Sequence, residues 1–411
     1  MGATRNYNVA LQLKGHFKNH FVVTTKNQQF LPKQVLPESD SFNTFPVRTF
    51  DYRTFLHYFF RKNAYFRGNL EERTLLSWMI KLRDSFPFNV LIDEGSLIYI
   101  FNGFRQGKKL IRQHGIRYIY SSFRPYADHI IAWMLKRWSP DLHWIADFRD
   151  PHVDLNRHNV FFPKIQHAFD RRIFQKADTV ITVSQGLANY FERYGRTAHV
   201  LHNGINPDFQ ALRNLPSTLS DKFTITYTGS LYADKQTAAP LFSALNMLIT
   251  SRQIPWEKIQ LVYAGKDQQR WDQWVADYGL DSINRSSHII DISEALALQR
   301  SSQINLLLSW SGPVIKGILT GKLFGYLDAR RPILGIVNGE YDSEFANIFA
   351  STKAGLVTFT DQDYTEQITR FLLRRYTAWE SQMESEDFFH EPALKAYYWP
   401  EMMQKFIRVL G

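Results

Sequence analysis

One loop in the second half of the sequence stands where an anionic ligand could be held. Its lysine, Lys235, follows a short apolar run that ends in Gly229 and Ser230. A glycine after a strand lets the main chain approach a ligand closely. The free N–H groups at a helix start attract negative charge, and Thr237 is placed to cap the helix after Lys235. Together these features predict a phosphate-binding site.

The first half carries polar, turn-forming residues after three short apolar runs, at residues 144–151, 177–184 and 201–204. Buried parallel strands end in this way when they open onto a ligand crevice. Asp147, Arg149 and Asp150 follow one of these runs. Either the two acids and the arginine form a satisfied ion pair, or all three residues line the crevice and face its ligands.

Helical and strand periodicities alternate almost throughout, which predicts an α/β fold with parallel, doubly wound sheets. In the first half, strands are expected over residues 20–25, 117–122, 143–148, 179–184 and 199–202, and helices over 6–14, 127–137, 163–176 and 186–194. A stretch over 206–221, rich in Pro, Asn, Ser and Asp, predicts a linker. The alternation then restarts, with strands at 223–228, 260–264, 303–308 and 332–337 and helices at 237–250, 321–328 and 392–410.

Composition narrows the class of protein. The chain has 411 residues, 44% of them hydrophobic and 21% charged, which is enough for two domains with real cores. It has no cysteine, which excludes disulfides and thiolate chemistry, and its 13 histidines show no metal-ligand spacing. No apolar run reaches the roughly 18 residues that span a bilayer, and no signal-peptide pattern is present. We therefore expect a cytoplasmic protein with no metal and no cofactor of its own.

The net charge of +10 has two explanations. Either the protein binds an anionic partner, or the basic surface only keeps the protein in solution. No nucleic-acid motif accompanies it, so no nucleic-acid partner is expected. The segment 50–69 mixes eight aromatic side chains with arginine and lysine. Such a mixture is typical of a segment at the interface of an anionic membrane. The same residues would also be found in an ordinary surface helix with an aromatic inner face.

The sequence resembles glycosyltransferase family 4, most clearly over residues 142–205 and 223–337. The loop from Gly229 to Lys235 is similar to the family's strand–glycine–lysine loop, which holds the donor diphosphate, although Ser230 stands where the family often has arginine. The segment 316–334 resembles the family's Lys-x-x-Glu-Tyr helix, with Lys322 and Tyr326 matching. The glutamate that grips the ribose is replaced by Gly325, so Glu340 or Asp342 is the candidate substitute.

This resemblance implies a two-domain GT-B fold with an interdomain cleft, which binds a nucleotide-sugar donor as co-substrate and a glycan or lipid-linked acceptor. It implies transfer with retention, in the synthesis of cell-surface polysaccharide at the inner face of the cytoplasmic membrane. Catalytic roles fall to His129, Asp150, Lys235 and Lys322. If Asp147, Arg149 and Asp150 line the crevice, they face the donor sugar or the acceptor. Donor or substrate contacts are expected at Gly2, Arg124, Arg149, Gly229, Ser230, Gly265, Lys316, Leu323, Tyr326 and Glu340.

The resemblance also sets the expected domains. Residues 1–212 form the acceptor-side domain, which the helix at 392–411 rejoins, and 213–391 form the donor domain. Family members begin with a buried strand followed by a glycine-rich loop and a helix. Residues 1–5 resemble that loop and 6–14 the helix, so we expect a missing first strand and a chain shortened by about 15–20 residues, of which a usual strand takes roughly 5–6.

Two other functions remain open. Another enzyme of the same architecture, such as a nucleotide-sugar 2-epimerase, would share these motifs. A non-catalytic, sugar-binding subunit is the second alternative, and Ser230 and Gly325 favour it because both remove contacts to the donor.

Overall fold

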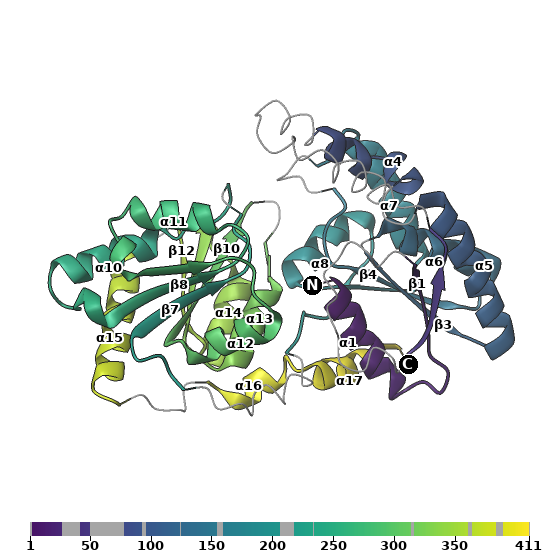
Figure 1. The fold of residues 1–411 in the computed structure, drawn as a ribbon. Helices are drawn as coiled ribbons and strands as arrows, with labels where there is room; N and C mark the ends of the chain where they lie inside the picture. Colours follow the sequence, from purple (N-terminus) through teal and green to yellow (C-terminus); the bar gives the residue numbers. More distant parts are fainter. Residues whose placement is uncertain are drawn as a thin grey trace. The chain divides into compact units, whose positions relative to one another are not determined.

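A computed structural model describes residues 2–26, 42–49, 78–92, 96–123, 125–153, 159–205, 218–232, 234–313, 316–360, 364–383 and 389–410. The aromatic and basic segment 50–69, most of the expected linker, and Arg124 lie outside these residues. The chain divides into two compact units (Figure 1). Unit 1 comprises Met1–Leu201 and Phe406–Gly411, and unit 2 comprises His202–Lys405.

Unit 1 is built on a parallel sheet of four strands in the order β3-β4-β5-β6. The strands are Tyr118–Phe123 (β3), His143–Phe148 (β4), Thr179–Thr182 (β5) and His199–Val200 (β6). Helices alternate with them: Phe88–Leu91 (α4), Ser96–His114 (α5), Tyr126–Trp138 (α6), Pro163–Lys176 (α7) and Gln185–Phe191 (α8), followed by the short turn η2 at Glu192–Tyr194. β4 is almost wholly buried, as its continuous apolar run predicts.

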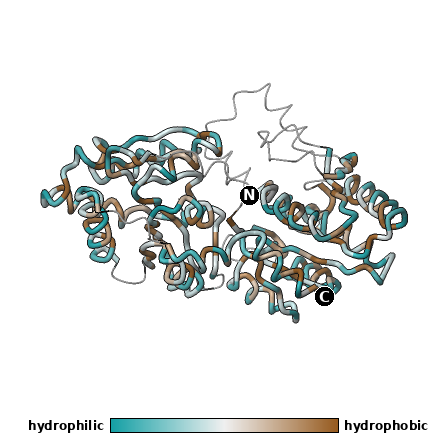
Figure 2. Tube along the Cα trace, turned by 90° about the horizontal axis from the view of Figure 1, so that it is seen from below, coloured by the Kyte–Doolittle hydropathy of each residue, from teal (hydrophilic) through white to brown (hydrophobic). Residues whose placement is uncertain are grey.

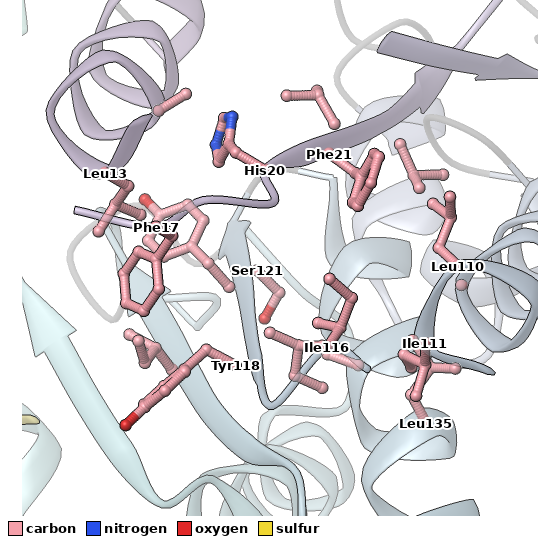
Figure 3. Close-up of a pocket in the computed structure, with 18 of the residues that line it drawn as sticks. Leu13, Phe17, His20, Phe21, Leu110, Ile111, Ile116, Tyr118, Ser121 and Leu135 are labelled. Atoms are coloured by element: carbon pink, nitrogen blue, oxygen red, sulfur yellow. The ribbon is translucent and has the colours of Figure 1, made fainter. Parts of the chain in front are cut away.

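The first residues of unit 1 make a separate layer. Helix α1 (Gly2–Lys14) is followed by β1 (Phe21–Thr25), which pairs in parallel with β2 (Asn43–Val47). Neither β1 nor β3 pairs on its other edge with any described strand. A cavity of about 470 Å³ lies there (Figure 3), and it is lined by consecutive residues of both strands, by α1, and by α5 and α6.

Unit 2 contains a parallel sheet of six strands in the order β12-β11-β10-β7-β8-β9. These are Phe223–Thr228 (β7), Ile259–Ala264 (β8), Asn284–Ser287 (β9), Ile304–Ser311 (β10), Ile333–Gly339 (β11) and Gly355–Phe359 (β12). The helices are Ala239–Thr250 (α10), Gln268–Ala276 (α11), Ile292–Ser301 (α12), Gly321–Ala329 (α13), Ser343–Thr352 (α14), Thr365–Glu380 (α15) and Glu391–Lys395 (α16), with short turns at Trp256–Lys258 (η4) and Asp281–Ile283 (η5). The last helix, Trp399–Leu410 (α17), begins in unit 2, and its residues from Phe406 on belong to unit 1.

Alternation along the central strands explains the two hydrophobic layers of unit 2. On β10, Leu306 and Leu308 join the core under α10, α11 and α15, whereas Leu307 joins the core under α13 and α14. Successive side chains of a strand point to opposite faces, so a continuous apolar run buries both faces. In the helices, hydrophilic and hydrophobic residues follow one another along the chain (Figure 2). This is typical of helices that cover a sheet with one face and expose the other.

The architecture confirms the predicted α/β class with doubly wound parallel sheets. Several of the expected elements differ from the structure. Helix α1 already begins at Gly2, so residues 2–5, expected as a loop, are helical, and the helix expected over 186–194 ends at Phe191. The helix expected over 392–410 is two helices, α16 and α17, because residues 396–398 make a turn between them. The strand expected over 199–202 is only His199–Val200. Several elements that the sequence reading did not identify are also present, among them α5.

Candidate functional site

The strand order of unit 2 places β7 beside both β8 and β10. From β7 the chain proceeds outward to β8 and β9, and then returns to start β10 on the other side. Ligands of open parallel sheets bind at such a switch point, outside the carboxyl ends of the strands. The loop after β7 begins with Gly229 and Ser230, so the predicted glycine loop lies at this position.

Gly229 has a left-handed φ of +109° and lies close to two other elements. Its N–H donates to Ala264 O (2.7 Å), and its carbonyl accepts from the Tyr263 hydroxyl (3.1 Å). A Cβ on Gly265 would be 2.2 Å from Gly229 O. Both glycines are therefore required where the loops after β7 and β8 meet.

Lys322, in the first turn of α13, reaches the same loop. Its Nζ donates to Ser230 O (2.9 Å) and to the Tyr227 hydroxyl, and it lies 4.2 Å from the centre of the Tyr227 ring. Burial lowers the pKa of Lys322 to about 7, although the charge of Asp267 opposes the shift. No described carboxylate forms an ion pair with this ammonium group, whose partners are neutral oxygens.

The loop between β7 and α10 is fixed by hydrogen bonds at both ends. Asp267 accepts from Leu231 N (2.8 Å), and Gln236 Nε2 donates to Leu308 O within β10 (2.7 Å). Lys235 Nζ lies 5.6 Å from the centre of the Trp310 ring. The Thr237 hydroxyl accepts from Ala239 N (3.1 Å), the first residue of α10. The expected cap at Thr237 is wrong, because the residue directly before the helix is Ala238, which has no capping side chain.

The remaining residues of the lysine helix lie deeper. Leu323 and Tyr326 are fully buried, and the Tyr326 hydroxyl accepts from Thr228 N (3.2 Å) at the end of β7. Gly325 is partly exposed, and a Cβ there would meet only Gln299 Oε1, at 3.8 Å. Gln299 Oε1 is buried and has no hydrogen-bond partner among the described residues.

The two acids considered as substitutes for the missing glutamate behave differently. Glu340 forms an ion pair with Lys316 (3.2 Å), and both side chains are about half exposed. Asp342 is buried and caps α14 by accepting from Glu344 N (3.0 Å) and Phe345 N (3.3 Å). Its other oxygen accepts from Gly317 N (2.6 Å), so this carboxylate is engaged in holding the loop before α13.

In unit 1, the acid at the end of β4 has a partner that sequence reading missed. Asp147 accepts from Arg5 Nε (2.7 Å) and Nη2 (3.1 Å) and from the Tyr120 hydroxyl (2.5 Å). Arg5 and Asp147 are both buried. They are 142 positions apart in sequence, so no local spacing could have indicated the pair.

The other predicted residues of unit 1 are dispersed. Arg149 donates through Nε to Phe123 O at the end of β3, and Asp150 is exposed. His129 is fully buried in α6, where its Nδ1 lies 2.8 Å from Ser121 Oγ, and burial lowers its pKa to about 3. Its ring is therefore neutral and packs against Phe148, with ring centres 4.4 Å apart. Gly2 begins α1.

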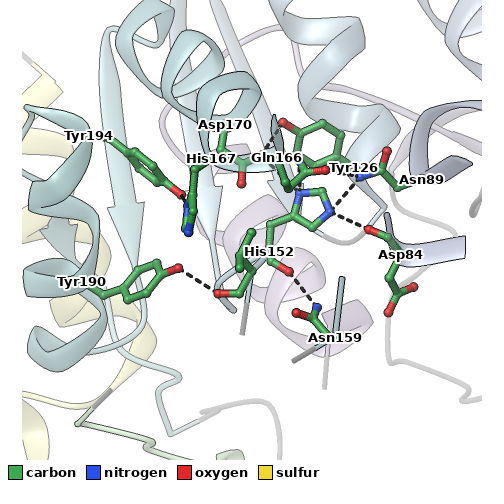
Figure 4. Close-up of polar contacts among 11 residues, drawn as sticks. Asp84, Asn89, Tyr126, His152, Asn159, Gln166, His167, Asp170, Tyr190 and Tyr194 are labelled. Carbon is green, nitrogen blue, oxygen red and sulfur yellow. Dashed lines mark hydrogen bonds and ion pairs between the residues drawn. The ribbon is translucent and has the colours of Figure 1, made fainter. Parts of the chain in front are cut away.

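A buried polar network fixes the segment that follows β4 (Figure 4). Asp170 of α7 accepts from the Tyr126 hydroxyl (2.7 Å) and Gln166 Nε2 (2.7 Å), and it lies 3.2 Å from His152 Nδ1. Asn89 Nδ2 in α4 donates to Gln166 Oε1 (2.8 Å). The network joins α4, α6 and α7 to the loop carrying Arg149 and Asp150, so its role is to position that loop.

The described residues include no group of three or more His, Cys, Asp or Glu side chains placed to hold a metal ion. No helix in the described part of the chain is long and apolar enough to cross a membrane.

Comparisons with known proteins agree with this geometry. Residues 81–209 match the model of Glycosyltransferase Family 4. Sucrose-phosphate synthase from Thermosynechococcus elongatus superposes with a TM-score of 0.58 at 16% identity, over 99% of this chain and 92% of that one. The N-terminal domain of Candida albicans trehalose-6-phosphate phosphatase gives a TM-score of 0.53 at 12% identity, over 97% and 92%.

The apo form of the lipopolysaccharide outer core galactosyltransferase WaaB gives a TM-score of 0.50 at 10% identity, over 76% of this chain and 80% of that one. Comparison with the sequences of curated proteins gives no significant match. At these identities the superpositions establish the fold. The protein has the GT-B fold, with two Rossmann-like domains, and its residues 81–209 match glycosyltransferase family 4.

Proposed function

We propose that this glycosyltransferase moves a sugar from a nucleotide-diphosphate donor to a glycan or lipid-linked acceptor, with retention of configuration. The proposal is carried by Lys322. A partly buried ammonium with a lowered pKa and only neutral oxygen partners, at the switch point of a parallel sheet, is a site that an anion would complete. A diphosphate has the negative charge that this ammonium group would pair with.

The chain's own groups would act on the leaving diphosphate. A bound anion would favour the protonated form of Lys322, which would neutralise charge as the sugar–phosphate bond breaks. The main-chain N–H groups in the first turn of α13 would add a partial positive charge, as helix starts do. Lys235 would supply a second cation, since it lies on the loop that starts at Gly229.

The acceptor and the pathway rest on resemblance. Family 4 enzymes commonly build capsule, lipopolysaccharide or exopolysaccharide, and the similar fold of WaaB belongs to a lipopolysaccharide galactosyltransferase. We place the acceptor at the cytoplasmic face of the membrane on this basis. Ligand contacts at Arg149 and Asp150 belong to the same proposal, whereas His129 is fully buried and would act only by positioning its neighbours.

A panel of nucleotide-diphosphate sugars tests the proposal by thermal shift and by hydrolysis of the donor. We expect one donor class to raise the melting temperature, because a ligand that binds only the native state stabilises it. Lys322→Ala should abolish the shift. Lys222→Ala is the matched control, because Lys222 is exposed and precedes β7 at the opposite end from Gly229.

A second candidate, a sugar-binding subunit without catalysis, is favoured by the absence of a side chain at Gly325. It predicts a thermal shift without any hydrolysis. If neither thermal shift nor hydrolysis occurs with any donor, the nucleotide-sugar site itself is wrong.

A further inference from the structure

One face of α5 exposes large apolar side chains. Leu97, Ile98 and Phe101 are 50%, 51% and 56% exposed. They occupy the first turns of the helix, and their spacing of three or four residues places them on one side. Exposed apolar residues are ordinary when they are scattered, but a contiguous group marks an interaction surface.

The same face becomes basic towards the end of the helix. Arg105, Lys109 and Arg112 are exposed and continue the spacing that begins at Leu97 and Phe101. The 19 residues of α5 include no aspartate or glutamate. The surface therefore has one apolar end and one basic end, with no acidic group on its own helix.

Aromatic rings lie directly beside these cations. Arg105 lies 5.5 Å from the centre of the Phe101 ring, and Arg112 lies 5.1 Å from that of Trp138 in α6. Lys108 lies 4.8 Å from the same Trp138 ring. Rings among cations characterise surfaces that sit at the level of lipid headgroups, because the ring is amphipathic and the cation meets phosphate.

The opposite face of α5 holds the helix in place. Gly103 and Gly107 are buried, and a Cβ on them would be 2.6 Å from Ile131 and 2.8 Å from Leu135 of α6. These close contacts leave α5 little freedom to rotate about its axis. The apolar and basic side chains are therefore kept on the outer surface of unit 1.

We propose that this face of α5, defined by Leu97, Ile98, Phe101, Arg105, Lys109 and Arg112, docks unit 1 onto an anionic lipid bilayer. The apolar end enters the boundary between headgroups and acyl chains, and the basic end pairs with lipid phosphates. Charge complementarity identifies the bilayer as the partner. The proposal rests on unit 1 alone and adds a docking surface to the proposed transfer reaction.

Sedimentation of the full chain with vesicles, without any donor, tests the proposal. Vesicles of phosphatidylcholine with one third phosphatidylglycerol should carry most of the protein down at low salt. Pure phosphatidylcholine vesicles should carry down several-fold less, and 0.5 M salt should release a large part of the bound protein. Equal sedimentation with both lipids, or none with the anionic vesicles, would overturn the proposal.

Two variants locate the surface. Arg105→Gln/Lys109→Gln/Arg112→Gln and, separately, Leu97→Ser/Phe101→Ser should each lower vesicle binding at least tenfold. Lys222→Gln/Arg270→Gln/Arg374→Gln is the matched control, because it removes the same charge from exposed positions of unit 2. A control that loses as much binding as the α5 variants, or α5 variants that bind like the unmodified protein, would show that α5 is not the docking surface. Circular dichroism confirms that each variant is folded, and donor binding by the same variants separates this result from the proposed transfer reaction.

Discussion

Gly229 and Lys322 lie so close that a methyl group on the glycine would be 2.7 Å from Lys322 Cε. The relationship joins the end of β7 to the start of α13, 93 positions further along the chain. It holds the Lys322 side chain against the loop where a diphosphate would bind. A side chain at 229 would have to displace the lysine.

Replacing Gly229 by alanine is expected to abolish donor binding and to lower stability by more than about 1 kcal/mol, because its φ of +109° also disfavours a Cβ. Gly279→Ala is the control. Its φ is also positive, at +67°, but no atom lies within 4 Å of the added Cβ. Calorimetric titration of the donor and urea unfolding measure the two effects. Equal loss of donor binding in both variants would mean that only backbone strain matters.

Donor affinity is expected to depend on pH through Lys322. Because burial lowers its pKa to about 7, the fraction of ammonium falls as pH rises above 7. The anion favours the charged form, so the Kd should rise by up to roughly tenfold per pH unit above 7. A nucleotide sugar is a suitable probe, because its diphosphate has no proton to lose in this range. In Lys322→Met the Kd should be higher and independent of pH. If the Kd of this variant still rises with pH as in the unmodified protein, the assignment to Lys322 is contradicted.

The free energy of unfolding should also depend on pH through Lys322. The unfolded lysine titrates near 10.5 and the folded one near 7, so the unfolded state binds more protons between these values. The free energy of unfolding is therefore expected to increase as pH rises from 7 towards 10.5. Lys322→Met should lose that increase, as measured by urea unfolding at several pH values. A dependence on pH that is identical in both proteins would disprove the link.

Arg5 and Asp147 form a buried ion pair, and removing one partner leaves the other charge without compensation. Arg5→Met is expected to destabilise unit 1 by about 3–5 kcal/mol. Arg5→Met/Asp147→Leu should recover part of that loss, because no charge then remains buried. Lys258→Met, which breaks the exposed pair with Glu380, should cost less than about 1 kcal/mol. Chemical denaturation of the four proteins gives the comparison.

The cavity between β1 and β3 leads to a test by protein engineering. Arg5 ties the first turn of α1 to the end of β4, so a strand placed in the cavity would end near the start of α1. Fusing about five apolar, β-branched residues and a short glycine loop ahead of Met1 is therefore expected to raise the melting temperature by several degrees, through pairing with the edges of β1 and β3 that no described strand occupies. A fusion with the same residues changed to serine and lysine is the control. Equal melting temperatures for the two fusions would contradict the prediction.

Much of the fold was determined by the sequence itself. The strands 143–148 and 223–228 and the helix 163–176 have the predicted bounds. A continuous apolar run bounded by turn residues predicts both that the segment is a strand and that it is buried. The positions of the glycine–lysine loop and of the lysine helix also follow from these runs, whereas their expected role in donor binding comes from the family resemblance.

Other elements were not predicted because their residues depart from the usual hydrophobic periodicity. Helix α5 interrupts its apolar spacing with Gly103 and Gly107, which allow α6 to approach closely. The helix also has apolar residues on its exposed face, so its sequence does not separate an apolar inner face from a polar outer face. The strand β9, Asn284–Ser287, is polar and lies at the sheet edge, so hydrophobic periodicity could not reveal it.

The sequence by itself determined which residues carry charge and which segments form strands and helices, because these depend on side-chain chemistry and local spacing. Only the tertiary structure decided which charges meet. It pairs Asp147 with Arg5, engages Asp342 as a helix cap, and brings Lys322 to Gly229. The order of strands sets those distances, and that order arises from packing across the whole unit and not from neighbours in the chain.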